Sequence, residues 1–170
     1  MAVSRPTTLA DSTTANAGVA HRNICLVLEY DGSQFHGWQR QLAVPTIQGT
    51  LEDCLVRLLG DRVTVHGSGR TDAGVHALGQ TASFRTRSHL PLRAIQAGLN
   101  SLLPPAIAVV GIQEVPWEFH ARYSAKAKTY EYRILNRPYP SPLQRRYCWW
   151  LARPLDLAPL QAAAALLEGT

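Results

Sequence analysis

The sequence predicts an α+β domain built from one antiparallel sheet with two helices on one of its faces. Two helix-length segments with a single apolar face, 47–59 and 92–103, alternate with four short β-type segments. Between residues 23 and 115 the order is strand, helix, strand, strand, helix, strand. This order is typical of a ferredoxin-like βαββαβ unit.

Turn and cap residues mark the ends of these elements. The first strand is short and apolar and ends at the turn signal of Asp31 and Gly32. The first helix is expected to begin after Thr46, a residue type that caps helix N-termini, and to end at Gly60. The second is stopped by Pro104. The expected strands are Asn23–Tyr30, Arg62–His66, Ala77–Thr86 and Ala106–Val115, and the second helix is Leu92–Leu103.

A second, similar unit is expected to begin after this domain and to remain incomplete. Thr129–Leu135 alternates like a strand, Tyr147–Leu151 is a further β-type segment, and Asp156 can cap a helix. We therefore expect a disordered tail over 1–21, a ferredoxin-like half over 22–125 and the incomplete start of a second half over 126–170. For the tail, an organelle-targeting peptide is the weaker alternative, because the first 20 residues carry only Arg5 as a base and include Asp11.

Positive charge is concentrated in one stretch of the chain. The formal net charge is +5, and Glu131 is the only acid between Phe119 and Arg153. A stretch of one sign suits a polyanion such as nucleic acid, although a solvated basic face has the same composition. Tyr130 and Tyr132 would share one face of a strand there, available for stacking on an exposed base or for ordinary packing. The basic residues of this stretch are Arg122, Lys126, Lys128, Arg133, Arg137, Arg145, Arg146 and Arg153.

Composition argues against several other classes of protein. No apolar run approaches the roughly 20 residues that a membrane helix needs. The three cysteines are odd in number and far apart, which indicates thiols in a reducing cytoplasm rather than a disulfide framework. The histidines show no metal-ligand spacing, so no metal is predicted.

The segment with the most unusual sequence is Gly67–His76, GSGRTDAGVH. Its glycines permit a tight backbone and the close approach of a ligand. Arg70 and Asp72 are two residues apart, so an extended backbone would turn both side chains to one side, where the guanidinium favours the ionised carboxylate. A surface ion pair that stabilises the turn is the alternative. A triphosphate-binding loop is excluded, because its lysine is absent and a strand follows instead of a helix.

Five blocks of the sequence resemble, in order and spacing, the tRNA pseudouridine synthase A (TruA) family. The resemblance runs from about Asn23 to the last residue, and the family continues beyond it. Ser68 is a small departure, since the family usually has Ala there. The blocks are YDGSQFHGWQRQ (30–41), TIQGTLE (46–52), GSGRTDAGVHALGQ (67–80), FHARYSAKAKTYEYRI (119–134) and EGT (168–170).

The resemblance implies a cytoplasmic homodimer without a cofactor that isomerises uridine to pseudouridine in the anticodon stem-loop of tRNA, at the 38 to 40 region. It also implies two similar halves whose sheets meet over a basic cleft. By position, Asp72 matches the catalytic aspartate, Arg70 the arginine that pairs with it and assists base flipping, and Tyr130 the tyrosine that stacks on the target uracil. The candidate RNA contacts are Arg40, Arg122, Lys126 and Lys128.

Two other functions stay open at this point. A non-catalytic RNA-binding fragment is the main alternative, because the second half of the cleft is expected to be missing. An acid-base hydrolase built on Asp72 and His76 is the weaker one, since no nucleophile-elbow motif accompanies them.

Overall fold

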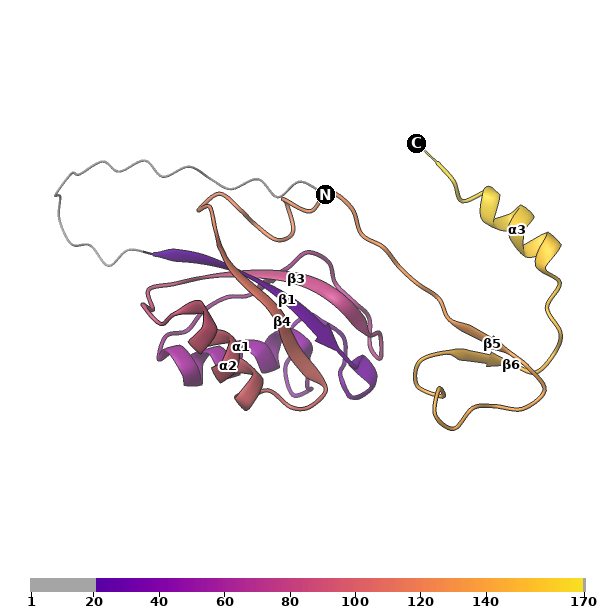
Figure 1. Cartoon of the computed structure of the whole chain (residues 1–170), viewed down its shortest axis with the longest axis horizontal. Coiled ribbons are helices and arrows are strands. Elements are labelled where there is room, and N and C mark those ends of the chain that lie inside the picture. The colour runs from indigo at the N-terminus through magenta and orange to yellow at the C-terminus, as the bar shows by residue number, and fades with distance from the viewer. Residues whose placement is uncertain (1–20, 170) are drawn as a thin grey trace. The chain divides into compact units, whose positions relative to one another are not determined.

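The computed structural model describes residues 21–169, which form two compact units, 21–124 and 125–169. The tail expected over 1–21 lies, apart from His21, outside the described residues. Figure 1 shows the first unit as a sheet covered by helices, and the second as a pair of short strands followed by a helix.

The first unit is built on a four-stranded antiparallel sheet with the strand order β2-β3-β1-β4. Its central strand β1 pairs with β3 on one side and with β4 on the other. Alternation along β1 turns Ile24, Leu26 and Leu28 toward the core, where all three are fully buried. The strands are β1 (Arg22–Tyr30), β2 (His66–Gly67), β3 (Ala77–Thr86) and β4 (Ile107–Val115).

Helices α1 (Ile47–Leu59) and α2 (Leu92–Leu102) lie next to each other on one face of this sheet (Figure 1). The two helices approach closely at Gly98, where a Cβ atom would lie 2.6 Å from the Leu58 side chain. Their apolar faces and the inner face of the sheet form one core. The helical residues that are fully buried in it include Leu51, Leu55, Ile95 and Leu99.

The ends of α1 are held by the residues that the sequence indicated. Thr46 Oγ1 accepts a hydrogen bond from the Gly49 N–H at 3.2 Å, and Gly60 ends the helix with a left-handed φ of 78°. The α+β class and the antiparallel sheet are therefore confirmed. The clearest boundary error in this unit is β2, expected at Arg62–His66, because only His66 and Gly67 pair with β3.

The second unit contains β5 (Ile134–Asn136), β6 (Trp149–Leu151) and α3 (Leu157–Ala165). β5 and β6 pair in parallel through three residues each. The strand predicted at Thr129–Leu135 is wrong for most of its length, because residues 125–133 have no strand partner and no regular structure. Sequence alternation alone does not make a strand when no neighbour satisfies the backbone. The helix begins, as predicted, after Asp156, whose carboxylate accepts from the Ala158 N–H at 3.1 Å.

Within residues 21–169, no helix is long and apolar enough to cross a membrane. In the same range, no three His, Cys, Asp or Glu side chains gather closely enough to hold a metal ion. Cys25 and Cys54 are free thiols buried in the first unit, and Cys148 is a free thiol in the second.

Candidate active site

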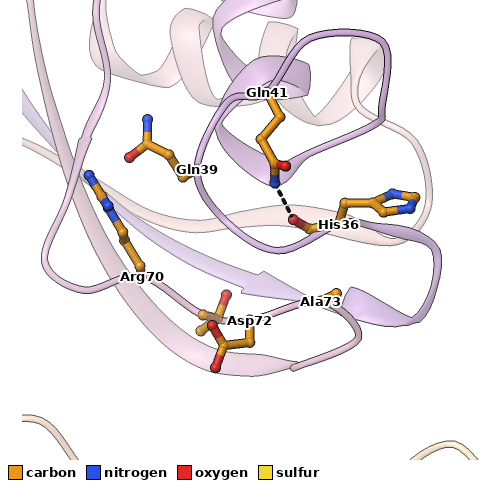
Figure 2. Close-up of a pocket in the computed structure, with 7 residues that line it drawn as sticks. His36, Gln39, Gln41, Arg70, Asp72 and Ala73 are labelled. Atoms are coloured by element: carbon orange, nitrogen blue, oxygen red, sulfur yellow. Dashed lines mark hydrogen bonds between the residues drawn. The ribbon is translucent and has the colours of Figure 1, made fainter.

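A surface pocket of about 350 Å³ lies between two loops of the first unit (Figure 2). One loop connects β1 to α1, and the other connects β2 to β3 and carries the GSGRTDAGVH sequence. The pocket brings Arg70 and Asp72 of the second loop together with polar residues of the first. Its lining residues are His36, Gln39, Gln41, Arg70, Thr71, Asp72 and Ala73.

The two loops are joined by backbone hydrogen bonds on both sides of Asp72. The Trp38 N–H donates to Thr71 O at 2.9 Å, and the Gly74 N–H donates to Phe35 O at 3.2 Å. The backbone that carries Asp72 is thus fixed by the loop opposite.

A buried tyrosine, Tyr30, also holds the residue that precedes Asp72. Tyr30, 3% exposed at the end of β1, shares a hydrogen bond of 2.9 Å with the Thr71 hydroxyl. Burial raises the pKa of the Tyr30 phenol above its ordinary value, which outweighs the lowering by its hydrogen bond with Thr71. Thr71 is therefore held through both its carbonyl and its side chain, immediately before Asp72.

Two glycines allow the loops to pack this closely. Gly37 has a φ of 86°, and a Cβ there would lie 2.6 Å from Thr71 O. A Cβ at Gly67 would lie 2.5 Å from the indole ring of Trp38, which is itself 2% exposed. Larger residues at these positions would push the loops apart.

The near side of the GSGRTDAGVH loop is fixed by β3. Gln80 Nε2 donates to Gly69 O at 2.7 Å, and Ser68 Oγ donates to Gln80 Oε1 at 2.8 Å. Ser68, where the sequence departs from the family pattern, thus adds a hydrogen bond that an alanine could not make. The loop ends at His76, whose Nδ1 lies 3.2 Å from the Gly32 nitrogen and 3.1 Å from an Asp31 carboxylate oxygen.

The Asp72 carboxylate is exposed and, among residues 21–169, makes no hydrogen bond or ion pair through its side chain. Its backbone carbonyl accepts from the Val75 N–H at 3.2 Å, so the main chain is held while the carboxylate is left open. A carboxylate on a fixed backbone, at the edge of a pocket and without a protein partner, is suited to act on a bound molecule.

Arg70 does not pair with Asp72 in this structure. Figure 2 shows the Arg70 side chain directed toward Gln39 and the Asp72 carboxylate directed away from it. No ion pair joins Arg70 to a described acidic residue. The two side chains that an extended backbone would place on one side are therefore not paired in this structure.

The other predicted site residues are distributed over both units. The Arg40 guanidinium makes ion pairs with Glu52 at 3.0 Å and Asp53 at 2.6 Å, so its charge is already balanced. Arg122 belongs to the first unit and is exposed, with its guanidinium 5.9 Å from the Tyr123 ring centroid. Lys126, Lys128 and Tyr130 lie in the second unit on its irregular segment, and Tyr130 is 64% exposed.

Sequence reasoning missed Gln39, which lines the pocket, and the polar pair Gln48 and Glu52 on α1. The sequence did contain a pattern that indicates this pair. Gln48 and Glu52 are four residues apart and stand beside Ile47 and Leu51 on the helix, so both polar side chains fall near the buried stripe. Polar residues at such positions indicate a buried hydrogen-bond network.

Comparison with known proteins assigns this arrangement to a family. A family model described as tRNA pseudouridine synthase matches residues 26–124, which include both pocket loops. The chain belongs to the tRNA pseudouridine synthase family.

Curated relatives share this similarity over most of the chain. It is 45% identical over 149 residues to the tRNA pseudouridine synthase A of Thermoanaerobacter sp. (strain X514), covering 88% of this chain and 61% of that protein. It is 49% identical over 148 residues to the tRNA pseudouridine synthase A of Citrifermentans bemidjiense, covering 87% and 59%. The match to that of Moorella thermoacetica is 47% over 146 residues, covering 85% and 59%. The chain therefore spans about three-fifths of the length of these relatives.

Proposed function

We propose that this protein acts as a tRNA pseudouridine synthase, isomerising uridine to pseudouridine with Asp72 as the catalytic carboxylate. The observation that carries the proposal is the Asp72 side chain itself. It is exposed at a pocket, lacks a protein partner among the described residues, and extends from a backbone that the opposite loop holds on both sides. The family membership and the names of the curated relatives support the same reaction.

The reaction is an isomerisation, so substrate and product contain the same atoms. The bond from the ribose C1′ to N1 of uracil breaks, a bond from C1′ to C5 forms, and the hydrogen on C5 leaves while N1 gains a proton. An ionised Asp72 can serve as a nucleophile or can stabilise the positive charge that develops on the sugar. Neither role needs a cofactor.

The base must leave its stack for this chemistry. Extruding a nucleotide costs a few kcal/mol, which protein contacts must offset. We propose that Arg70, whose guanidinium has no ion-pair partner among the described residues, assists base flipping and pairs with Asp72 when RNA is bound. We propose that Tyr130, which is exposed, stacks on the target uracil.

The finer assignment of the substrate rests on the resemblance of the sequence blocks. We propose uridines of the anticodon stem-loop of tRNA, in the 38 to 40 region, as the targets, and a cytoplasmic homodimer as the active form. Arg122, Lys126 and Lys128 are exposed and are proposed to contact the RNA backbone. Arg40 stays a predicted RNA contact, although the structure already gives its guanidinium two carboxylate partners.

The same proposal extends to the architecture. The first unit, expected over 22–125, is proposed as a ferredoxin-like half, which the order β4-β1-β3-β2 and the two helices on one face support. Residues 126–170 are proposed as the start of a second half.

Release of tritium from tRNA labelled at uracil C5 tests the function, because the reaction expels that hydrogen. The full chain is compared with Asp72→Asn, an isosteric change at an exposed side chain that leaves the backbone hydrogen bonds intact. We expect release by the parent protein and none by the variant. Full release by Asp72→Asn would refute the role of Asp72, and tRNA binding without release by the parent would favour the non-catalytic alternative.

A further inference from the structure

A buried polar network lies behind the pocket, on the side of α1. Its centre is formed by Gln48 and Glu52, which are 8% and 5% exposed and one helical turn apart. Burying a carboxylate is costly unless it is paired and hydrogen-bonded, so the partners of Glu52 are informative. These partners come from the loop after β1 and from the segment that precedes β2.

Glu52 is linked to the two sides of the pocket at once. One carboxylate oxygen, Oε1, accepts from the Val65 N–H at 3.0 Å, and the other, Oε2, accepts from Arg40 Nη1 at 3.0 Å. Arg40 belongs to the loop after β1, whereas Val65 precedes β2 and the loop that carries Asp72. One buried side chain therefore joins the loop that carries Gln39 to the residue that precedes β2, the strand leading into the Asp72 loop.

Both polar atoms of the Gln48 side-chain amide form hydrogen bonds within the network. Its Oε1 accepts from the Arg40 backbone N–H at 2.8 Å, and its Nε2 donates to Val65 O at 3.0 Å and to Glu52 Oε1 at 3.1 Å. Because the Arg40 partner is a backbone donor and the Val65 partner a backbone acceptor, the amide of Gln48 can have only one orientation.

This orientation in turn determines that of Gln39, which lines the pocket. Gln39 donates through Nε2 to Gln48 Oε1 at 2.7 Å, since an oxygen facing that acceptor would be repelled. Its own carbonyl oxygen is left on the other side. Figure 2 shows that oxygen turned toward the Arg70 side chain.

We propose that Glu52 and Gln48 are positioning residues of this site: they hold the segments carrying Gln39 and Asp72 at a fixed spacing and keep the Gln39 carbonyl oxygen turned toward the pocket as a hydrogen-bond acceptor. Neither residue lines the pocket, so both act through their partners. The consequence for catalysis rests on the proposed function, whereas the effect on the two loops does not.

Hydrogen exchange of the full chain, followed by mass spectrometry, tests the effect on the loops. Glu52→Gln keeps the size and an acceptor for Val65 but removes the charge opposite Arg40. Gln48→Leu removes every bond of the amide. We expect exchange in segment 36–45 to rise roughly tenfold in Gln48→Leu, because the Arg40 N–H loses its acceptor. Exchange in segment 67–76 should rise with it, because its backbone hydrogen bonds to the first loop loosen, and both rises should be smaller in Glu52→Gln. Exchange in β1 and α2 stays as in the parent protein.

Ile95→Val is the matched control, since it loosens the core from α2, a helix that carries no residue of the network. We expect it to leave both loop segments unchanged. If Gln48→Leu fails to fold, Arg40→Met and Arg40→Lys provide a milder pair of variants. We expect Arg40→Lys to loosen the loops less than Arg40→Met, because lysine keeps the positive charge. The proposal is overturned if a folded Glu52→Gln protein exchanges like the parent in both segments, or if Ile95→Val loosens them equally.

Tritium release adds a readout that lost stability alone does not produce. At a temperature where all variants are folded, we expect Glu52→Gln to lower kcat with little change in the KM for tRNA, because the spacing of reacting groups changes while Arg122, Lys126 and Lys128 stay exposed. Ile95→Val keeps the parent kcat. An unchanged kcat in Glu52→Gln beside an active parent would contradict the positioning role. If the parent itself releases no tritium, the proposed function fails for this chain, and hydrogen exchange still decides the role of the network.

Discussion

Replacing Gly67 by alanine should separate the two loops of the pocket. The new Cβ would lie 2.5 Å from the Trp38 ring, and an ordinary contact between carbon atoms is about 3.5–4.0 Å. Neither partner can yield easily, because Gly67 pairs with Ala82 in the sheet and Trp38 is 2% exposed. The clash therefore requires a displacement of about 1 Å.

The magnitude follows from this displacement. Overpacking of a close-packed core costs about 1–3 kcal/mol of unfolding free energy. For a domain of this size, that corresponds to a fall in Tm of roughly 5–20 °C. Trp38 also holds the Thr71 carbonyl next to Asp72, so the carboxylate should shift as well. A misplacement of about 1 Å can cost on the order of 10²-fold in rate.

Thermal unfolding followed by circular dichroism, together with tritium release, measures both effects. Gly79→Ala is the matched control, because Gly79 lies on the adjacent strand β3 and nothing is within 4 Å of its added Cβ. We expect the control to unfold at or slightly above the Tm of the parent. A Gly67→Ala protein as stable as Gly79→Ala would refute the reasoning that close contact with Trp38 fixes the loop.

Three further predictions concern other groups of the protein. Because burial raises the pKa of Tyr30, the folded state holds the phenol proton more tightly than the unfolded state. The free energy of unfolding should therefore fall as pH rises above 10. Tyr30→Phe should remove that fall in alkaline denaturation curves. Desolvation and the nearby charges of His66, Arg85 and Arg122 lower the pKa of His120 below 6.5, so the folded state favours its neutral form. The contribution of neutral His120 to the free energy of unfolding should be lost as pH falls below 6.5. His120→Gln should therefore make stability depend less on pH on the acid side. Replacing both Lys126 and Lys128 by alanine should weaken tRNA binding. The slope of log K against log salt concentration should become shallower by about one unit for each phosphate that the variant no longer neutralises. An unchanged slope would mean that these side chains do not contact the RNA.

The local elements of the first unit were readable from the sequence. Thr46 and Gly60 mark the two ends of α1 through their own side-chain and backbone preferences, and Ala77–Thr86 is the strand β3. Asp72 was proposed as a candidate from the sequence, as part of a loop rich in glycine, and its role stays a prediction. In each case the information lies within a few residues of the position concerned.

Contacts between distant residues needed the tertiary structure. The Thr71 carbonyl between Arg70 and Asp72 accepts from the Trp38 N–H of the other loop, and the two side chains are not paired. The irregular segment around Tyr130 has no strand partner, although its sequence alternates as a strand does. Neither arrangement could be predicted, because hydrogen-bond partners lie far away in the sequence.

Residues close together in the chain were enough to predict the kind of fold, the limits of α1 and the carboxylate proposed for the chemistry. The residues that surround this carboxylate became known only from the folded chain. The sequence shows Glu52 as one acid on a helix and Arg40 as one base in a loop. In the fold, the Glu52 carboxylate is buried beside Val65 and Gln48 and pairs with Arg40, because a buried charge is costly without a counterion and hydrogen bonds.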